Sequence, residues 1–218
     1  MGPETSFEKH MSMRIAGYYD LREAVLRSIS DNIRDPADWL DCGCGSGGSV
    51  RLSVERFPDT RFVLADPSAD NLGQAREVYG DGRFSYAVGT TDSLDIEDGS
   101  FDVITAVLSH HYYINIEARA AAVANCFRML RPGGMFLTVE HILHPGSQAE
   151  ADAQWESYMR GQGLPEESIR EMFDRRGTVY HPLTVEQHVR ILEDAGFRDV
   201  RKFWDSCSDA GLFGFKPA

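Results

Sequence analysis

The sequence has few cysteines and no arrangement of them that predicts a structural role. Only four of its 218 residues are cysteine. Cys42 and Cys44 lie within a glycine-rich stretch, and Cys126 and Cys207 stand alone, so the spacing matches neither a disulfide framework nor a zinc site. We interpret all four as small, packable residues of a protein in a reducing compartment.

Basic charge and long apolar runs are also scarce. The chain has 22 Lys and Arg residues against 34 Asp and Glu, a formal net charge of -12, and its basic residues do not cluster as a phosphate-binding surface requires. No segment approaches the roughly 20 apolar residues that span a bilayer, and the polar start MGPETSFEKHMSMR lacks the apolar stretch of a signal peptide. We therefore expect a cytoplasmic protein with a small-molecule substrate, without nucleic-acid or membrane partners, and able to form a homodimer.

Short apolar runs alternate with patterns of helical periodicity. The runs that predict strands are residues 38–43, 61–66, 84–89, 101–109 and 134–142, with a hairpin of 199–206 and 212–217. The helical patterns cover residues 17–33, 49–57, 68–80, 116–134 and 184–197, with Ser49 and Ser68 as expected helix starts. This alternation predicts an α/β fold, a Rossmann-like seven-stranded and mostly parallel sheet with helices on both faces and a C-terminal antiparallel hairpin.

Residues 146–178 interrupt this alternation after the fifth strand. They read as two polar helices hinged at GQGLP. Because ligands bind at the carboxyl ends of parallel strands, an insertion at this point is expected to lie over the ligand as a lid. We therefore predict one domain, residues 1–218, with a helical cap over residues 1–35 and a lid over residues 146–178.

The stretch LDCGCGSGG follows the first predicted strand. Gly43, Gly45 and Gly48 fit the G-x-G-x-x-G spacing, and Asp66 ends the next strand, a pattern that NAD-binding proteins also show. Asp41 argues against NAD, because a carboxylate beside the turn repels a pyrophosphate on the following helix. It favours a cationic ligand without phosphate, such as S-adenosylmethionine with its ammonium and sulfonium.

With these motifs the sequence resembles class I S-adenosylmethionine-dependent methyltransferases over nearly the whole chain. The resemblance is carried by LDCGCGSGG, FVLADPSADNLGQAR, DGSFDVITAVLSHH, LRPGGMFLTVE and LTVEQHVRILEDAGF. MRIAGYYDLREAV, RGQGLPEESI and FWDSCSDAGLFGFKP look like the branch that contains the carboxy-S-adenosylmethionine synthases. The resemblance implies S-adenosylmethionine as cofactor and methyl transfer to a small molecule. A carboxy-S-adenosylmethionine synthase and a non-catalytic cofactor-binding protein are the alternatives.

The resemblance also assigns cofactor contacts to individual residues. Gly43, Gly45 and Gly47 would let the backbone approach the methionine moiety, Asp41 would organise its ammonium, and Asp66 would accept the ribose hydroxyls. Many relatives place an aspartate after the third strand to bind the adenine amino group. This chain has Thr90 there, so the sequence does not identify the residue that makes this contact. The other cofactor candidates are Arg14, Tyr18, Pro67, Ser68, Thr91, Asp92 and Leu108.

Residues after the fourth and fifth strands would face the transferred group. His110 or His111 is a candidate general base, with activity expected to rise through a pKa of about 6–7, or one of the pair simply packs. The substrate candidates are Tyr112, Glu140, His141, His144 and, by the resemblance, Arg160, which is otherwise a solvated helix-end residue. A His/carboxylate metal site is the weaker alternative, and we assign no metal. His10 and His188 are expected at the surface.

Overall fold

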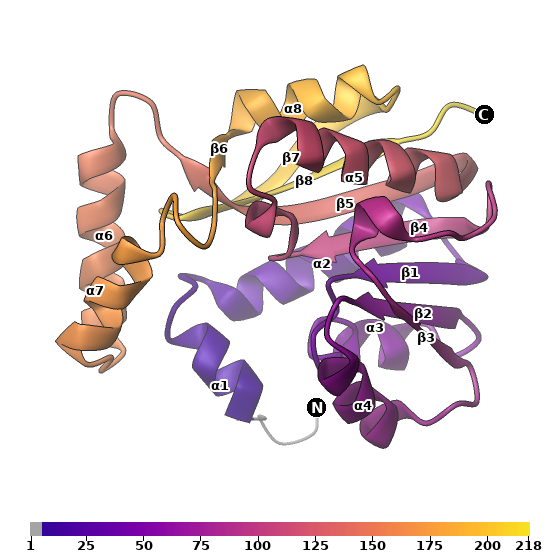
Figure 1. The fold of residues 1–218 in the computed structure, drawn as a ribbon, viewed down its shortest axis with the longest axis horizontal. Helices are drawn as coiled ribbons and strands as arrows, with labels where there is room; N and C mark the ends of the chain where they lie inside the picture. Colours follow the sequence, from indigo (N-terminus) through magenta and orange to yellow (C-terminus); the bar gives the residue numbers. More distant parts are fainter. Residues whose placement is uncertain (1–5) are drawn as a thin grey trace.

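The computed structural model describes residues 6–218, so the first five residues of the predicted cap lie outside it. Figure 1 shows one twisted sheet between layers of helices. Its strands are β1 (Asp38–Cys42), β2 (Arg61–Asp66), β3 (Phe84–Val88), β4 (Phe101–Val107), β5 (Leu130–Leu143), β6 (Leu183–Thr184), β7 (Arg198–Asp205) and β8 (Asp209–Phe215). Seven follow the order β3-β2-β1-β4-β5-β8-β7, parallel from β3 to β5 and antiparallel through β8 and β7.

This topology confirms the predicted mostly parallel sheet with a C-terminal antiparallel hairpin. The strand count is eight, one more than predicted, because β6 pairs with Ile142 and Leu143 at the end of β5. A two-residue strand is too short to show the alternation on which a sequence-based prediction depends.

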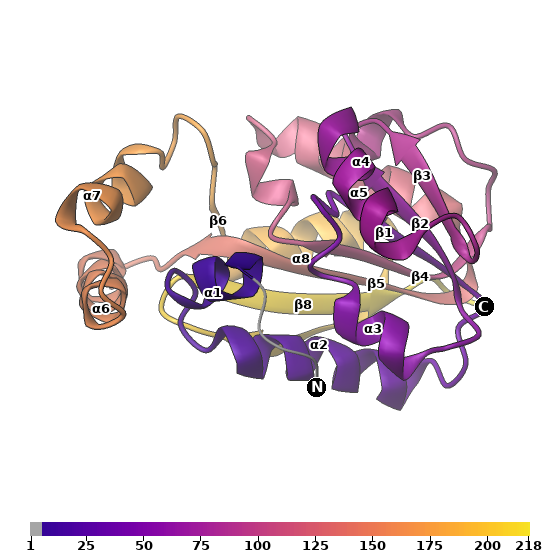
Figure 2. The same cartoon turned by 90° about the horizontal axis from the view of Figure 1, so that it is seen from below.

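The helices are α1 (Ser6–Ser12), α2 (Tyr18–Asn32), α3 (Arg51–Arg56), α4 (Ala69–Tyr79), α5 (Ile116–Met129), α6 (Gln148–Gly161), α7 (Glu166–Asp174) and α8 (Val185–Asp194), with the 3₁₀ turns η1 (Thr91–Ser93) and η2 (His110–Tyr112). Figure 2 shows α2 and α3 on one side of the sheet and α5 and α8 on the other. Within residues 6–218, none of these helices combines the length and the apolar content needed to cross a membrane.

The central strands divide their side chains between two cores. Along β1, Trp39 belongs to the core that α2 and α4 cover, and Leu40 belongs to the core under α5 and α8. Val103 and Ile104 of β4 alternate in the same way. Successive residues of a strand point to opposite faces, so a strand buried on both faces reads as the continuous apolar run seen in the sequence.

Two predicted helix starts have different outcomes. Ser68 caps α4, and its hydroxyl accepts a hydrogen bond from the Asn71 backbone N–H at 3.2 Å. Ser49 does not cap α3, which begins at Arg51, because the Ser49 hydroxyl donates to Asp41 at 2.6 Å instead.

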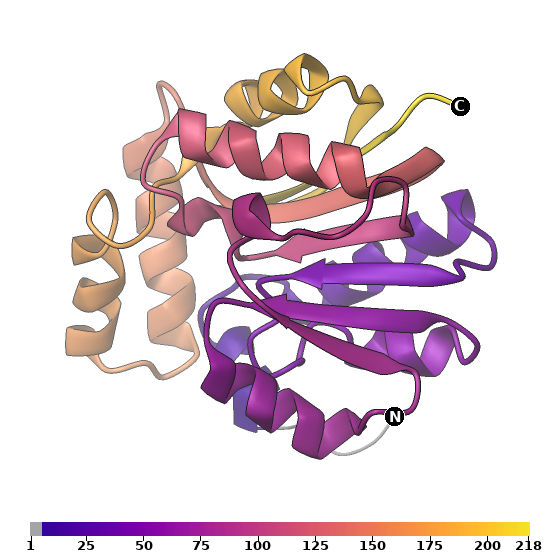
Figure 3. The ribbon, with the colours of Figure 1, turned by 45° about the vertical axis from the view of Figure 1, so that its right-hand side comes forward.

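The insertion after β5 forms α6 and α7, beyond the carboxyl edge of the sheet (Figures 1 and 3). These helices are less polar than the sequence suggested, because Trp155 and Met159 of α6 and Ile169 of α7 form a third buried cluster. The indole N–H of Trp155 donates to the Arg14 carbonyl at 2.7 Å, and the Tyr158 hydroxyl donates to the Ser12 carbonyl at 2.5 Å. Two side chains of α6 therefore tie the insertion to the end of α1 and to the chain that follows it.

Candidate active site

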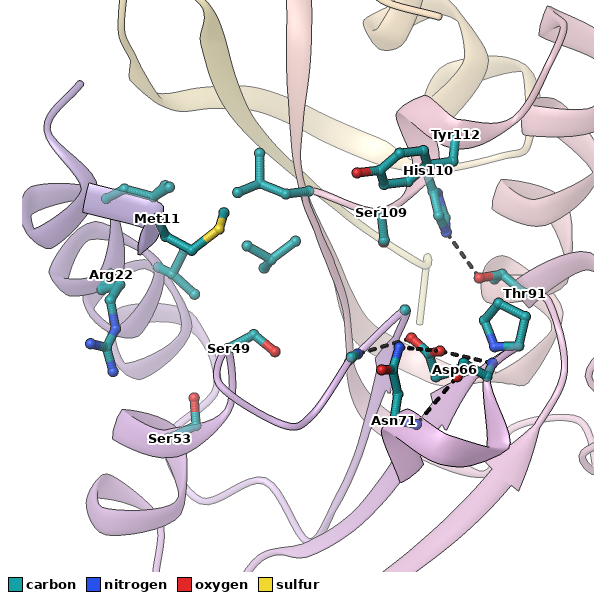
Figure 4. Close-up of a pocket in the computed structure, with 18 of the residues that line it drawn as sticks. Met11, Arg22, Ser49, Ser53, Asp66, Asn71, Thr91, Ser109, His110 and Tyr112 are labelled. Atoms are coloured by element: carbon teal, nitrogen blue, oxygen red, sulfur yellow. Dashed lines mark hydrogen bonds between the residues drawn. The ribbon is translucent and has the colours of Figure 1, made fainter. Parts of the chain in front are cut away.

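A cavity of about 590 Å³ opens at the carboxyl ends of β1, β2 and β4, with α2 as its opposite wall (Figure 4). This volume is typical of a small-molecule site. The predicted site residues that line the cavity are Tyr18, Gly43, Gly45, Asp66, Pro67, Ser68, Thr91, Leu108, His110 and Tyr112. Those that do not line it are Arg14, Asp41, Gly47, Asp92, His111, Glu140, His141, His144 and Arg160.

The glycine turn after β1 brings backbone to the cavity wall. Gly43, Gly45 and Gly47 have φ values of 69°, 55° and 83°, in the left-handed region that favours glycine. A Cβ on Gly43 would lie 2.3 Å from the Ser109 Cβ, and one on Gly47 would lie 2.5 Å from the Tyr79 ring. A Cβ on Gly45 would meet nothing within 4 Å. Gly45 therefore offers open space to a ligand, whereas Gly47 is needed for packing.

Asp66 presents a prearranged carboxylate at the end of β2. Its Oδ2 accepts from the Gly45 backbone N–H at 2.9 Å, and its Oδ1 accepts from the Ser68 backbone N–H at 2.9 Å and the Asn71 side-chain amide at 3.1 Å. These donors fix the carboxylate while it lines the cavity. A carboxylate offers about four lone-pair sites, so Asp66 keeps capacity for a hydroxyl donor of a bound ligand.

Asp41 lies one layer behind the cavity wall, not on it as predicted. It is buried and accepts from the Ser49 hydroxyl and the Thr105 hydroxyl, both at 2.6 Å. Burial raises the pKa of Asp41 to about 6, which the two hydrogen bonds only partly oppose. Ser49 lines the cavity, so its hydroxyl connects Asp41 to the cavity wall.

His110 is the one member of the histidine pair that lines the cavity. Its Nε2 lies 3.1 Å from the Thr91 hydroxyl oxygen, and its ring stacks on Phe136. Burial lowers the pKa of His110 to about 4, below the predicted value of about 6–7, because the interior disfavours an imidazolium. The ring is therefore neutral at physiological pH, and it is a weak base.

His111 and Glu140 lie behind the cavity and hold the η2 turn. The buried Glu140 carboxylate accepts from the backbone N–H groups of His110 at 3.2 Å and His111 at 2.8 Å, and from the Thr138 hydroxyl at 2.6 Å. The His111 Nδ1 lies 2.9 Å from the same carboxylate, and burial lowers the pKa of His111 well below its usual value. The prediction that Glu140 contacts substrate does not fit this arrangement, because its oxygens already serve internal donors.

The remaining substrate candidates also lie away from the cavity. His141 is stacked on His111, and its Nδ1 lies 2.6 Å from the buried Asp209. The His144 backbone N–H donates to Gln148 at 2.9 Å. Arg160 is half exposed and pairs with Glu156 at 2.8 Å and Glu166 at 2.6 Å, as a solvated helix-end arginine does. Among residues 6–218 no group of three or more His, Cys, Asp or Glu side chains is placed to hold a metal ion.

Three further predictions differ from the structure. The Asp92 carboxylate accepts from the Tyr113 hydroxyl at 2.8 Å and does not line the cavity. Arg14 donates to the His10 carbonyl at 3.2 Å, outside the cavity. His188, expected at the surface, is buried on the inner face of α8, whereas His10 is exposed as expected.

Sequence reasoning missed several cavity residues. Asn71 and Ser49 carry polar groups beside Asp66 and Asp41, and Arg22 and Ser53 lie at the α2–α3 end of the cavity (Figure 4). Asn71 could have been found from its place three residues after the helix cap Ser68. Arg22 gave no such signal, because a single arginine beside the apolar stripe of α2 resembles any solvated helix residue.

Comparison with known proteins places this geometry in a family. Residues 40–134 match the family described as methyltransferase domain. The chain is 32% identical over 223 aligned residues to a carboxy-S-adenosyl-L-methionine synthase of Staphylococcus epidermidis, covering 96% of this chain and 92% of that protein. It is 26% identical over 212 residues to the enzyme of the same name from Chromohalobacter salexigens, covering 94% and 77% of the two chains.

A solved structure shares the fold at lower sequence identity. The structure is phosphoethanolamine N-methyltransferase 2 of Haemonchus contortus, solved with phosphomonomethylethanolamine and S-adenosylhomocysteine. It superposes with a TM-score of 0.66 at 17% identity, over 92% of this chain and 53% of that one.

Proposed function

Because the chain belongs to the class I S-adenosylmethionine-dependent methyltransferase family, in the branch that contains the carboxy-S-adenosylmethionine synthases, we propose that it methylates a small-molecule acceptor. The observation that carries this proposal is the cavity itself. Its volume is about 590 Å³, and Asp66 and Arg22 are its only charged lining residues among those described. A wall with one arginine suits a small acceptor better than a polyanion such as nucleic acid.

The residues present fit S-adenosylmethionine. Asp66 is positioned to accept from the ribose, Gly45 leaves room beside the methionine moiety, and Pro67 and Thr91 flank the space for the adenine. When bound, the cofactor supplies an activated methyl group with its own leaving group. The work left to this chain is to hold the acceptor in line with that methyl group.

The acceptor would enter along the wall formed by Tyr18, Tyr112 and His110. Tyr112 is 53% exposed, which places it at the mouth of the cavity. The low pKa of His110 makes it a poor proton acceptor, so this site suits an acceptor that is already nucleophilic at neutral pH. Alignment by aromatic side chains then takes the place of strong general-base catalysis.

The insertion formed by α6 and α7 is proposed to act as a lid within this single domain. It stands at the carboxyl edge of the sheet and is tied to Ser12 and Arg14 by side chains of α6. Those ties link it to α1, whose Met11 lines the cavity. Movement of the insertion is therefore expected to change access for the acceptor more than affinity for the cofactor.

The proposal can be tested with S-adenosylmethionine labelled in its methyl group. Purified protein is incubated with the label and a cell extract separated into small molecules, RNA and protein. We expect label in the small-molecule fraction with wild type and at least tenfold less with Asp66→Ala at a cofactor concentration below the wild-type Kd. Incorporation confined to RNA or protein would contradict the small-molecule proposal.

A second candidate function is carboxy-S-adenosylmethionine synthesis, favoured by the similarity over 92% of the Staphylococcus epidermidis enzyme. The arginine considered for it, Arg160, lies outside the cavity. Mass spectrometry of the nucleoside eluted from purified protein separates the two functions. A methyltransferase should release S-adenosylmethionine or its demethylated product, and a synthase should release a carboxylated form.

A further inference from the structure

Three exposed apolar side chains follow one another closely at the mouth of the cavity. Tyr112, Ile114 and Ile116 are 53%, 73% and 41% exposed, and together they form what we call the apolar rim. Val78 and Val88 are also largely exposed, but each stands alone, as single apolar residues at a protein surface commonly do. A cluster of exposed apolar side chains beside a cavity instead indicates a surface that a ligand or partner covers.

The backbone of the rim is fixed so that Ile114 faces outward. The backbone is extended at Tyr113 and Asn115, so these two side chains point to one side and Ile114 points to the other. The Tyr113 hydroxyl donates to Asp92 at 2.8 Å, and the Asn115 side chain caps α5 by accepting from the Ala118 backbone N–H at 2.8 Å. Turning Ile114 inward would break these hydrogen bonds, so its exposure is built into the fold.

The rim continues the wall of the cavity. Tyr112 lines the cavity and is also half exposed, so it belongs both to the wall and to the rim. Figure 4 shows Tyr112 beside His110, and Leu108 from the end of β4 lines the same cavity. A molecule held beside His110 can therefore extend past Tyr112 toward Ile114 and stay in contact with apolar side chains.

Size and charge select the occupant of the rim. Three partly exposed side chains fall short of the roughly 800 Å² that each partner buries in a stable protein interface, which argues against a second copy of this chain. From Phe84 to Ala118 the chain has no Lys or Arg, and Asp92 and Glu117 flank the rim in sequence. These charges would repel an anionic lipid surface. The apolar part of a small molecule fits the size, the charge and the position of the rim.

We propose that the methyl acceptor carries a hydrocarbon chain that leaves the cavity past Tyr112 and lies on the apolar rim, an inference that rests on the proposed function. The reacting group of the acceptor stays inside the cavity, and the chain covers Ile114 outside it. Ile114 is then a specificity-determining residue, because it favours acceptors whose chain is long enough to reach it. The substrate class is thereby narrowed from a small molecule to an amphipathic small molecule.

The first part of the test identifies the labelled product. Wild type is incubated with methyl-labelled S-adenosylmethionine and the small-molecule fraction of a cell extract, and the products are separated by reversed-phase chromatography. We expect the label in late-eluting, apolar products. Label only in polar products that are not retained would overturn this proposal and leave the proposed function intact. Label in no small molecule would contradict the proposed function, and this proposal with it.

The second part measures the contribution of the rim with 4-ethylphenol and 4-hexylphenol as probes. Calorimetric titration gives the affinity of both for wild type, Ile114→Ser and the control Val78→Ser, each saturated with S-adenosylhomocysteine. Val78 is 70% exposed on α4 and does not line the cavity. Wild type should bind 4-hexylphenol about tenfold or more tightly than 4-ethylphenol, because the longer chain buries more apolar surface on the rim.

Ile114→Ser should reduce this preference to about threefold or less, because a serine offers the chain little apolar surface. Its affinity for 4-ethylphenol should stay within about twofold of wild type, since the shorter chain does not reach the rim. Val78→Ser should keep the full preference. The same preference in Ile114→Ser as in wild type, or no binding of either phenol to wild type, would overturn the proposal.

Two further measurements separate the acceptor from other occupants of the rim. Wild type and Ile114→Ser are expected to sediment alike, and neither is expected to bind phosphatidylcholine vesicles. A wild-type dimer that Ile114→Ser converts to a monomer would assign the rim to a second copy of this chain. Vesicle binding by wild type that is lost in Ile114→Ser would assign it to a membrane, and either result would overturn the proposal.

Discussion

The carboxyl ends of β1 and β2 and those of β4 and β5 meet at the same edge of the sheet, but they use their polar residues differently. At β1 and β2, Asp66 and Gly45 face the cavity, and internal hydrogen bonds orient the groups that a ligand can still reach. At β4 and β5, Glu140 and His111 are paired with each other inside the protein. Residue type at a strand end therefore does not distinguish a binding group from a buried structural one.

Removing the buried Glu140 carboxylate is expected to have the largest effect and tests whether Glu140 is a structural residue. Glu140→Gln replaces an acceptor of three hydrogen bonds by an amide that cannot accept them all. We expect the free energy of unfolding to fall by about 3 kcal/mol, because buried donors lose their partner. Chemical denaturation measures it, with the exposed Glu193→Gln as control. A fully stable variant with a raised acceptor KM would instead restore Glu140 as a substrate ligand.

Asp66 tests the role of the polar groups that face the cavity at the ends of β1 and β2. Asp66→Ala should weaken S-adenosylhomocysteine by about 1.5–3 kcal/mol, since it removes a charge-assisted acceptor of the ribose. Calorimetric titration measures the loss, and circular dichroism checks the fold. Asp70→Ala is the matched control, because Asp70 lies exposed in the first turn of α4, the helix that follows β2. Affinity within about twofold of wild type would reject the ribose assignment.

The buried histidines predict an acid-dependent loss of stability. Burial lowers the pKa of His188 to about 4, so between about pH 6.5 and 4 the unfolded chain binds the proton and the folded chain does not. Stability therefore falls as pH falls through this window, by about 2 kcal/mol at pH 5 from His188 alone. His188→Leu should remove that part, measured as the difference in unfolding free energy between pH 7.5 and 5. His10→Leu should change the difference less, because His10 is exposed, although burial also lowers its pKa.

Asp41 changes stability with pH in the opposite direction from His188, over the acid part of the same pH range. Burial raises its pKa to about 6, so the folded chain binds the proton more tightly than the unfolded one between about pH 4 and 6. This contribution to stability is lost as pH rises through 6. The pH profile of His188→Leu should therefore show stability declining from pH 5 toward 7 more than wild type does.

The smallest expected effect concerns the ties of the insertion. Tyr158→Phe removes the hydroxyl that donates to the Ser12 carbonyl. Losing about 1 kcal/mol from that tie should raise the acceptor KM about fivefold, with S-adenosylhomocysteine affinity within about twofold. Tyr86→Phe is the control, because the Tyr86 hydroxyl donates to the Gly80 carbonyl at 2.6 Å, away from the cavity. Unchanged kinetics in Tyr158→Phe would count against the lid.

The sequence was most informative where a local pattern decides the structure. The buried strands, the glycine turn and the Ser68 cap each follow from residues within a few positions of one another. The apolar face of the insertion could also have been found, because Trp155 and Met159 are four residues apart. His188 likewise stands on the same helical face as Ile191 and Leu192, a spacing that predicts burial.

The rest depended on contacts between distant segments. Nothing near Glu140 in the sequence shows that it accepts from the η2 turn, 29 and 30 residues earlier. The place of Arg22 on the cavity wall is likewise visible only once α1, α2 and the glycine turn are assembled around the cavity. Such arrangements are set by packing, which periodicity and motif spacing do not record.

The central claim is that the cavity between Asp66 and Arg22 binds the cofactor along its length. A crystal structure of the protein with S-adenosylhomocysteine tests this most directly. The account predicts a ribose hydroxyl on the Asp66 carboxylate and the sulfur near Leu108. A nucleoside bound outside this cavity, or in it with the ribose away from Asp66, would contradict the account.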